Sequence, residues 1–296
     1  LLSRRQRQMC IRDRLNKDKK ILIVGLGLIG GSYAEGLTRA GFEVGAITKE
    51  QISIDFAIQK KIIQHGMIDV KEEYVRQFDI IIFALYPHIF IEWIKQYQKY
   101  FKEEAIITDV TGVKTKIVYP IQAILRKDIE FIACHPMAGK EVYGVENSDV
   151  HIFQGANYII TPTLKNTKKA IDVAKDIGTL LQFKHIVVLT PEAHDEMIGF
   201  LSQLTHCIAV ALMTCKESHH LVEYTGDSFR DLTRIAKINE EMWCELFLMN
   251  KSELLSQMDL FIQQFTQLKI ALEEENVEKM KDIMKLSTIR RKYFDQ

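Results

Sequence analysis

The chain has 296 residues, of which 47% are hydrophobic and 26% charged, enough to bury one large domain or two of ordinary size. Lysine plus arginine equals aspartate plus glutamate, at 39 each, which argues against a protein that binds nucleic acid through its overall charge. The five cysteines are scattered without the spacing of metal ligands, which indicates a cytoplasmic protein with reduced thiols and no metal site.

The N-terminal residues and the apolar runs bear on targeting. Residues 1–14 are basic and lack the apolar segment of a secretory signal, and residues 1–18 are expected to be a disordered or artefactual tail. The longest apolar run, residues 80–86, falls short of the roughly 20 residues that span a bilayer. No membrane association is therefore expected.

Residues 19–190 alternate short apolar runs with segments of helix length. The expected strands cover residues 19–25, 43–47, 79–87, 105–110, 130–136, 157–161 and 183–189. Near-continuous apolar strands separated by helices are typical of a parallel sheet that is covered on both faces. This part of the chain is therefore predicted to be an α/β domain.

The sequence GLGLIG directly follows the first expected strand and begins a helix. Gly25 permits a tight turn, Gly27 lets the backbone approach a pyrophosphate, and Gly30 lets the helix pack closely on the strand. Leu28 and Ile29 start that helix, whose free N–H groups and partial positive charge favour phosphate. The motif predicts a dinucleotide site in a Rossmann-type domain.

The end of the second strand bears on the choice between NAD and NADP. The acidic residue that usually binds the ribose, about 20 residues after the glycines, is missing. Thr48 and Lys49 can hold a 2′-phosphate, which favours NADP, whereas Glu50 can bind the ribose hydroxyls, which favours NAD. The residues alone leave both cofactors open.

A histidine and a glutamate stand near the end of the strand at residues 130–136. His135 ends that strand, and ligands of doubly wound sheets bind beyond the carboxyl ends of the strands. A histidine there can accept a proton near neutral pH, although a structural role is equally common. Glu141 either orients His135, contacts a substrate or is a surface charge.

Thirteen of the fifteen glycines and all five prolines lie at or before Pro191, so residues 191–296 are predicted to be nearly all helix. Asn239, which precedes two acidic residues, predicts a helix N-terminus. A polar stripe spans about 60° of another helix and consists of Asp195, Gly199, Ser202 and His206. The stripe is either a packing network or one wall of a cleft between two domains.

Residues 226–243 include Arg230, Asp231, Arg234 and Trp243. Asp231 and Arg234 are three residues apart on an expected helix, where a surface ion pair is the ordinary outcome. The neighbouring apolar residues can instead bury one face and fix Arg234, and a fixed guanidinium binds a carboxylate through two hydrogen bonds. Trp243 is either a core residue or part of such a site.

Together these segments resemble the prephenate dehydrogenase family over residues 19–286. The matching motifs are GLGLIGGS, TDVTGVK, HPMAGKE, HDEMIGFLSQLTH, FRDLTRIA and the dipeptide MW. The resemblance implies a Rossmann-type nucleotide-binding domain at residues 19–190. It also implies an all-α domain at residues 191–296, through which two chains form a homodimer.

The resemblance implies roles for individual residues as well. His135 is the expected catalytic histidine at the ring hydroxyl of the substrate, and Arg234 is the expected receptor for a substrate carboxylate. The other expected site residues are Ser202 and His206, which are catalytic, and Asp231, Trp243 and Glu141, which bind substrate. The family usually has serine where this chain has Gly112, and Thr111 is expected to supply that hydroxyl instead.

The activity implied is the oxidation of prephenate, a dicarboxylate, to 4-hydroxyphenylpyruvate and carbon dioxide, with hydride transfer to NAD or NADP, in tyrosine biosynthesis. The alternative substrate is arogenate, the amino analogue, which gives tyrosine directly. A different reductase with a helical dimer domain would need a catalytic lysine, for which Lys216 and Lys237 are the candidates. A nucleotide-sensing module would have lost His135 or Arg234, and both are present.

Overall fold

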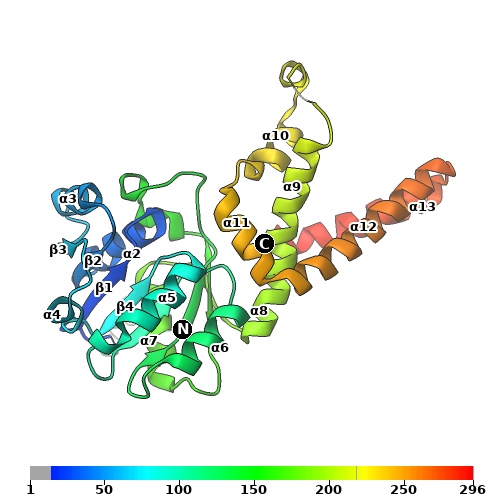
Figure 1. Ribbon diagram of the computed structural model, residues 1–296. Helices are drawn as coiled ribbons and strands as arrows, with labels where there is room; N and C mark the ends of the chain where they lie inside the picture. Colours follow the sequence, from blue (N-terminus) through cyan, green and yellow to red (C-terminus); the bar gives the residue numbers. More distant parts are fainter. Residues whose placement is uncertain (1–14, 218, 296) are drawn as a thin grey trace, which may run out of the picture.

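The computed structural model describes residues 15–217 and 219–295, which form an α/β unit followed by a helical unit (Figure 1). The main sheet has six parallel strands in the order β3-β2-β1-β4-β5-β6. They are β1 (Lys20–Val24), β2 (Glu43–Ile47), β3 (His65–Met67), β4 (Ile80–Phe83), β5 (Ile106–Asp109) and β6 (Glu130–Phe131). The strand order reverses between β1 and β4, which is where such sheets bind ligands. The predicted fold class is confirmed.

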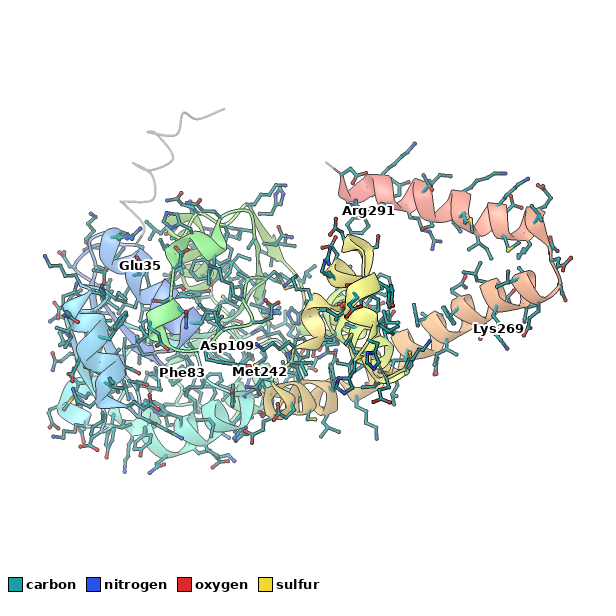
Figure 2. The ribbon with its side chains drawn as sticks, turned by 90° about the horizontal axis from the view of Figure 1, so that it is seen from above. Glu35, Phe83, Asp109, Met242, Lys269 and Arg291 are labelled. Atoms are coloured by element: carbon teal, nitrogen blue, oxygen red, sulfur yellow. The ribbon has the colours of Figure 1, made fainter. Side chains whose placement is uncertain are left out.

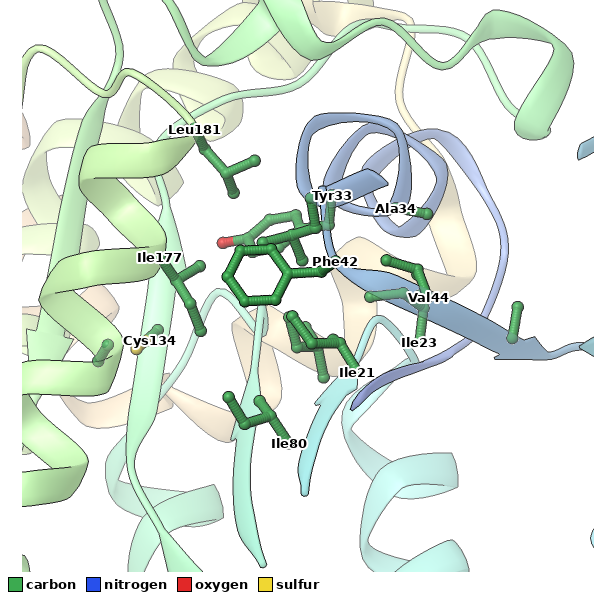
Figure 3. Packing of buried hydrophobic residues seen from close by; sticks show 14 of the residues in the cluster. Ile21, Ile23, Tyr33, Ala34, Phe42, Val44, Ile80, Cys134, Ile177 and Leu181 are labelled. Carbon is green, nitrogen blue, oxygen red and sulfur yellow. The ribbon is translucent and has the colours of Figure 1, made fainter. Parts of the chain in front are cut away.

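Helices cover both faces of this sheet. Successive residues of a strand point to opposite faces, so each strand contributes side chains to two hydrophobic cores. Ile21 and Ile23 pack into a first core, part of which Figure 3 shows, and Leu22 and Val24 pack into a second. The helices over the first core are α2 (Leu28–Arg39), α3 (Gln51–Gln59) and α7 (Lys168–Leu180). Those over the second are α4 (Glu72–Val75), α5 (Pro87–Tyr97) and α6 (Thr115–Ile124). Short 3₁₀ turns are η1 (Gln98–Tyr100), η2 (Val145–Asn147) and η3 (Val150–Phe153).

A separate three-stranded sheet follows, formed by β7 (Ala133–Pro136), β8 (Asn157–Thr161) and β9 (His185–Val188), with β7 antiparallel to β8. The expectations of a single strand over residues 130–136 and of one parallel sheet are therefore wrong. The strand breaks at Ile132, because the N–H of Cys134 donates to the Asp109 side chain (3.0 Å) instead of to the backbone of β5. The break places β7 at the carboxyl end of β5.

The helical unit begins with one long helix that contains a π-helical segment. Its three parts are α8 (Pro191–Ile198), the π segment η4 (Gly199–Leu204) and α9 (Thr205–Thr214). The remaining elements are η5 (Leu221–Tyr224), α10 (Asp227–Thr233), η6 (Arg234–Ala236), α11 (Glu240–Met249), α12 (Lys251–Glu273), α13 (Val277–Arg291) and η7 (Lys292–Phe294). Asn239 caps α11 as predicted, since its Oδ1 accepts from the N–H of Met242 (2.8 Å).

The helices α12 and α13 extend away from the rest of the helical unit as an arm (Figures 1 and 2). Large apolar side chains on this arm are exposed in the single chain, namely Leu255, Leu260, Phe261, Ile262, Phe265, Met284, Leu286 and Ile289. Large exposed apolar patches mark interaction surfaces in soluble proteins. The arm therefore has the character of an interface.

Two findings bear on the expectations for the N-terminal residues and for the membrane. Leu15 is 3% exposed and packs into the first core, so the tail expected at residues 1–18 is too long, and residues 1–14 lie outside the described residues. The helix Pro191–Thr214 is long and apolar enough to cross a membrane by length and composition. A search for unbroken apolar runs misses it, because polar residues such as Asp195 and His206 interrupt it. A single helix of this kind is weak evidence for a membrane.

Candidate active site

In the glycine turn between β1 and α2, Gly25 and Gly30 pack tightly against the protein, whereas Gly27 faces open space. Gly25 has a φ of +97°, and a Cβ there would lie 2.3 Å from the carbonyl oxygen of Ala84. A Cβ at Gly30 would lie 1.9 Å from the carbonyl oxygen of Gly25, so both positions require glycine. A Cβ at Gly27 would meet nothing within 4 Å, which leaves room for a ligand against the backbone.

The first turn of α2 faces this open side. Gly27 is the N-cap and provides no side-chain acceptor, so the first N–H groups of the helix, at Leu28 and Ile29, are available to a ligand. Free N–H groups and the helix dipole suit a pyrophosphate. Thr48 and Lys49 follow β2, the neighbour of β1, with Thr48 partly exposed and Lys49 exposed. These residues fit a dinucleotide whose ribose lies at the end of β2.

Substitution of Gly30 by alanine tests this turn. The added Cβ cannot fit without moving the backbone of Gly25, and overpacking of this kind costs roughly 1–3 kcal/mol of stability. We expect a lower melting temperature and weaker binding of NAD⁺ by titration calorimetry. Gly139→Ala, where a Cβ meets nothing within 4 Å, is the matched control and should behave as the unsubstituted protein. Unchanged NAD⁺ affinity in Gly30→Ala would place the dinucleotide elsewhere.

His135 lies in β7 and contacts a second histidine that the sequence interpretation missed. His135 Nδ1 and His194 Nε2 are 2.9 Å apart, and His194 Nδ1 lies 2.8 Å from Asp195 Oδ1. His194 and Asp195 are buried, whereas His135 is partly exposed. Burial first, and then the charges of His194 and Lys114, hold the pKa of His135 well below its usual value. His135 is therefore neutral at physiological pH and is able to accept a proton.

Asp195 joins the helical unit to the α/β unit. It accepts hydrogen bonds from the backbone N–H groups of Lys114 and Thr115 (both 2.8 Å), at the start of α6. Its pKa is lowered, because the bonds from His194 and Thr115 outweigh the effect of burial. The predicted polar stripe therefore divides, with Asp195 in the junction between units and Ser202 and His206 partly exposed.

A buried ion pair between Lys114 and Asp109 holds the backbone beside His135. Lys114 Nζ donates to Asp109 (2.7 Å) and to the carbonyl oxygen of Cys134 (2.6 Å), while Asp109 accepts from the N–H of Cys134 (3.0 Å). Both backbone polar groups of the residue before His135 are thus fixed by side chains. The only sequence signal for this pair was its place in the motif TDVTGVK.

Gly112 lies against the other side of the His135 ring. A Cβ added at Gly112 would be 3.8 Å from His135 Nε2 and 3.6 Å from Leu246, which is ordinary contact, so a serine would fit there. Thr111 is buried, and its hydroxyl donates to Asp109 and accepts from Lys114 (3.2 Å). The Thr111 hydroxyl is therefore already bonded within the protein, and its contact with the substrate stays a prediction.

The helical unit brings a second group of predicted residues together. Arg234 forms an ion pair with Glu141, which lies in the loop after β7. The ring centres of His206 and Trp243 are 3.8 Å apart. Burial chiefly lowers the pKa of His206, and the charges of Glu141 and Arg234 also act on it. His206 Nδ1 donates to the carbonyl oxygen of Ser202 (2.8 Å), which leaves Nε2 free to accept.

The helix α11 connects the two groups, since Trp243 stacks on His206 while Leu246 lies at Gly112. Figure 2 labels Met242 of α11 and Asp109 of β5 at this junction of the units. The carboxyl ends of β5 and β7, the loop with Glu141 and the face of α11 therefore surround one region.

Arg234 is less fixed than predicted. Its side chain is 63% exposed, and every described residue of α10, the helix before it, is at least partly exposed. Its partner is Glu141 rather than Asp231, which is exposed, and Arg230 pairs instead with Asp227 (2.7 Å). The exposed guanidinium is accessible to an incoming carboxylate. Its ion pair with Glu141 is readily displaced, because an exposed ion pair contributes only about 0–1 kcal/mol of stability.

Comparison with known proteins agrees with this arrangement. Residues 34–187 match the family model described as "Prephenate dehydrogenase, nucleotide-binding domain", and residues 190–286 match "Prephenate dehydrogenase, dimerization domain". The prephenate dehydrogenase of Lactococcus lactis is 32% identical over 255 residues, which are 82% of this chain and 68% of that protein. That of Bacillus subtilis is 29% identical over 276 residues, 88% of this chain and 72% of that protein.

A solved structure shows the same fold. Prephenate dehydrogenase from A. aeolicus, in complex with hydroxyphenyl propionate and NAD⁺, superposes with a TM-score of 0.84 at 32% identity. The superposition covers 93% of this chain and 98% of that chain. The two matched domains in this order, on a fold that brings the expected histidine and arginine to one junction, show that the chain belongs to the prephenate dehydrogenase family.

Proposed function

We propose that this protein is an NAD-dependent dehydrogenase that oxidises prephenate to 4-hydroxyphenylpyruvate and carbon dioxide in the cytoplasm, on the route to tyrosine. The observation that carries the proposal is His135, whose Nδ1 is held by His194 while its Nε2 faces Gly112, which has no side chain to bond to it. A neutral histidine with one free nitrogen suits removal of a hydroxyl proton. The glycine turn fits NAD⁺, as bound by the A. aeolicus relative.

Among the groups that the protein supplies, this reaction depends most on a base that accepts the hydroxyl proton. Bound NAD⁺ supplies the acceptor for the hydride that leaves the ring carbon bearing the hydroxyl. His135 Nε2 takes the hydroxyl proton, and the electron pair of the broken O–H bond forms the ketone. That ketone is conjugated with the two ring double bonds, which adjoin the saturated carbon with the carboxylate, so loss of carbon dioxide restores an aromatic ring. The extended ketone takes up the electrons released and becomes a phenolate oxygen, which regains the proton from His135 to give 4-hydroxyphenylpyruvate.

The other predicted residues bind and enclose the substrate. Arg234 receives a carboxylate, and Glu141, its present partner, is displaced when the substrate enters. Trp243 and His206 form a stacked wall, on which His206 Nε2 accepts a hydrogen bond. Ser202 and Asp231 are proposed to complete the polar contacts of the substrate. Lys216 and Lys237 are exposed, so the structure offers no support for a lysine-dependent reductase.

Steady-state assays of prephenate and arogenate, each with NAD⁺ and NADP⁺, test the proposal. We expect prephenate with NAD⁺ to have the highest kcat/KM, with equal yields of carbon dioxide and 4-hydroxyphenylpyruvate. A preference for arogenate would assign the alternative activity, and a preference for NADP⁺ would assign Thr48 and Lys49 to a 2′-phosphate. Absence of turnover with both substrates would contradict the proposed function.

The arm formed by α12 and α13 is proposed to hold two chains together as a homodimer. Phe265 on this arm is 63% exposed, and burial of such side chains against a second chain drives association. Light scattering at micromolar concentration should give twice the mass of one chain, and Phe265→Asp should shift it towards the monomer. Ile52→Asp, at a 76% exposed position on α3, is the control and should leave the dimer intact. A monomer in the unsubstituted protein would refute the assignment.

A further inference from the structure

The contact between His135 and His194 connects the proposed base to a buried carboxylate. His194 has an exposed fraction of zero, and its two nitrogens lie 2.9 Å from His135 Nδ1 and 2.8 Å from Asp195 Oδ1. Asp195 in turn accepts from two backbone N–H groups at the start of α6, so its position is fixed. Three side chains from β7 and α8 therefore form a line that ends at a helix N-terminus.

The nitrogen atoms that carry protons in this row of side chains can be assigned one after another, starting from Asp195. The lowered pKa of Asp195 keeps it ionised, and a carboxylate only accepts, so His194 Nδ1 must carry the proton. Burial chiefly lowers the pKa of His194, which makes the ring neutral and leaves Nε2 as an acceptor. His135 Nδ1 must then carry the proton that lies between the two rings. The remaining nitrogen of His135, Nε2, is unprotonated.

We propose that His194 is a positioning residue that holds His135 in the Nδ1–H tautomer, with Nε2 bare for the substrate hydroxyl, and that Asp195 fixes His194 in turn. The nature of the proton removed rests on the proposed function, but the tautomer does not. In hydrolases with a Ser-His-Asp triad, a carboxylate in direct contact performs this task. Here a second imidazole stands between the carboxylate and the base.

The absence of a side chain at Gly112 makes this contact decisive. Among the described residues, His194 is the sole side-chain hydrogen-bond partner of His135, and Gly112, whose added Cβ would lie 3.8 Å from Nε2, has no side chain that could bond to it. Nothing on the Nε2 side of the free enzyme thus selects the tautomer or the ring angle. Lys114 and Asp109 hold the backbone of β7 but do not bond to the ring.

The same three side chains also stabilise the positive charge that His135 acquires when it accepts a proton. The groups that face the two rings are Asp109 at the end of β5, Lys114 at the start of α6, and Asp195 from α8. Lys114 opposes a positive charge on either ring, whereas Asp195 and Asp109 favour one on His194. The imidazolium formed on His135 can therefore share its Nδ1 proton with His194, next to the ionised Asp195. This lowers the cost of the charge at the moment of proton transfer.

Two substitutions of His194 separate positioning from folding. An asparagine side chain reaches Asp195 from the place of Nδ1 but cannot reach His135, whereas a glutamine amide lies at the place of Nε2 and can accept from His135. We expect His194→Asn to lower kcat with prephenate by about 10–10²-fold, as misplacement of a reacting group does, with little change in KM. His194→Gln should recover part of this loss. NAD⁺ affinity and melting temperature show whether each variant folds.

Nitrogen NMR of the ¹⁵N-histidine-labelled dimer reads the tautomer without any substrate. We expect the unsubstituted protein to show His135 protonated at Nδ1 and unprotonated at Nε2, and His194→Asn to show exchange between the two tautomers. A proton on Nε2 in the unsubstituted protein would overturn the proposal, as would full kcat in folded His194→Asn. If the tautomer is as expected but neither substrate is turned over, the proposed function fails and the positioning role of His194 stands.

Discussion

Replacement of His135 by asparagine is expected to lower kcat by roughly 10²–10⁴-fold, the usual contribution of general-base catalysis. The asparagine amide lies at the place of Nδ1, so it keeps a partner in His194 and preserves the local structure. It has no atom at the place of Nε2 and cannot take up a proton. Since the glycine turn lies on β1 and α2, NAD⁺ should bind with unchanged affinity. Stopped-flow measurement of NADH formation gives both quantities.

The pH dependence of the unsubstituted enzyme provides a second readout. His135 acts only when neutral, and burial holds its pKa well below 6.5. The acid limb of kcat/KM should therefore have its midpoint below pH 6.5, and activity should fall only as the pH decreases through the lowered value. His185→Asn, at an exposed histidine on β9, is the control and should change neither kcat nor the profile. Substantial turnover by His135→Asn would remove His135 from the chemistry.

Loss of the Arg234 guanidinium should weaken the use of substrate while leaving the cofactor unaffected. A charge-assisted bond to a carboxylate contributes roughly 1.5–3 kcal/mol, so Arg234→Ala should reduce kcat/KM by about one to two powers of ten. The existing pair with Glu141 is exposed and is worth at most about 1 kcal/mol, so the substrate can displace it. Arg234→Lys should restore little, because an ammonium cannot make the two-pronged contact.

The control for Arg234 is an ion pair of similar exposure elsewhere. Arg76 pairs with Glu72 on α4, and its side chain is 58% exposed, so Arg76→Ala should leave the kinetics unchanged. Steady-state measurements with prephenate on all three variants decide the matter. If KM is unchanged in both Arg234 variants, the carboxylate is held elsewhere, and Arg230 is the next candidate.

The α/β core was predictable, because its information is local. The strands β1, β2, β4 and β5 are rich in apolar residues, and the glycine turn has a spacing that only one backbone geometry explains. The short strand β3 (His65–Met67) was not predicted, because its three residues form no apolar run. The second sheet was not predictable from such patterns. Its separation depends on Cys134 donating to a side chain of β5, and no apolar period records a partner so far away in the sequence.

The site residues also include some that the sequence could indicate and some that it could not. The sequence indicated His135 by its place at a strand end, and the motifs pointed to Trp243, which does stack on His206. It did not indicate His194, because a histidine on an apolar helix has no visible partner until β7 lies against α8. It overestimated the burial of Arg234, since apolar neighbours on one helix do not say whether another surface covers them.

The attachment of Asp195 to the start of α6 has a consequence for domain exchange. This carboxylate binds the backbone of the α/β unit, while its own carbonyl oxygen accepts from Asn250 of the helical unit (2.9 Å). These hydrogen bonds therefore fix the junction of the two units beside His135 and His194. A chimera that joins this helical unit to the nucleotide-binding half of a relative must preserve that anchoring point. Otherwise the histidine pair would separate even if both halves fold.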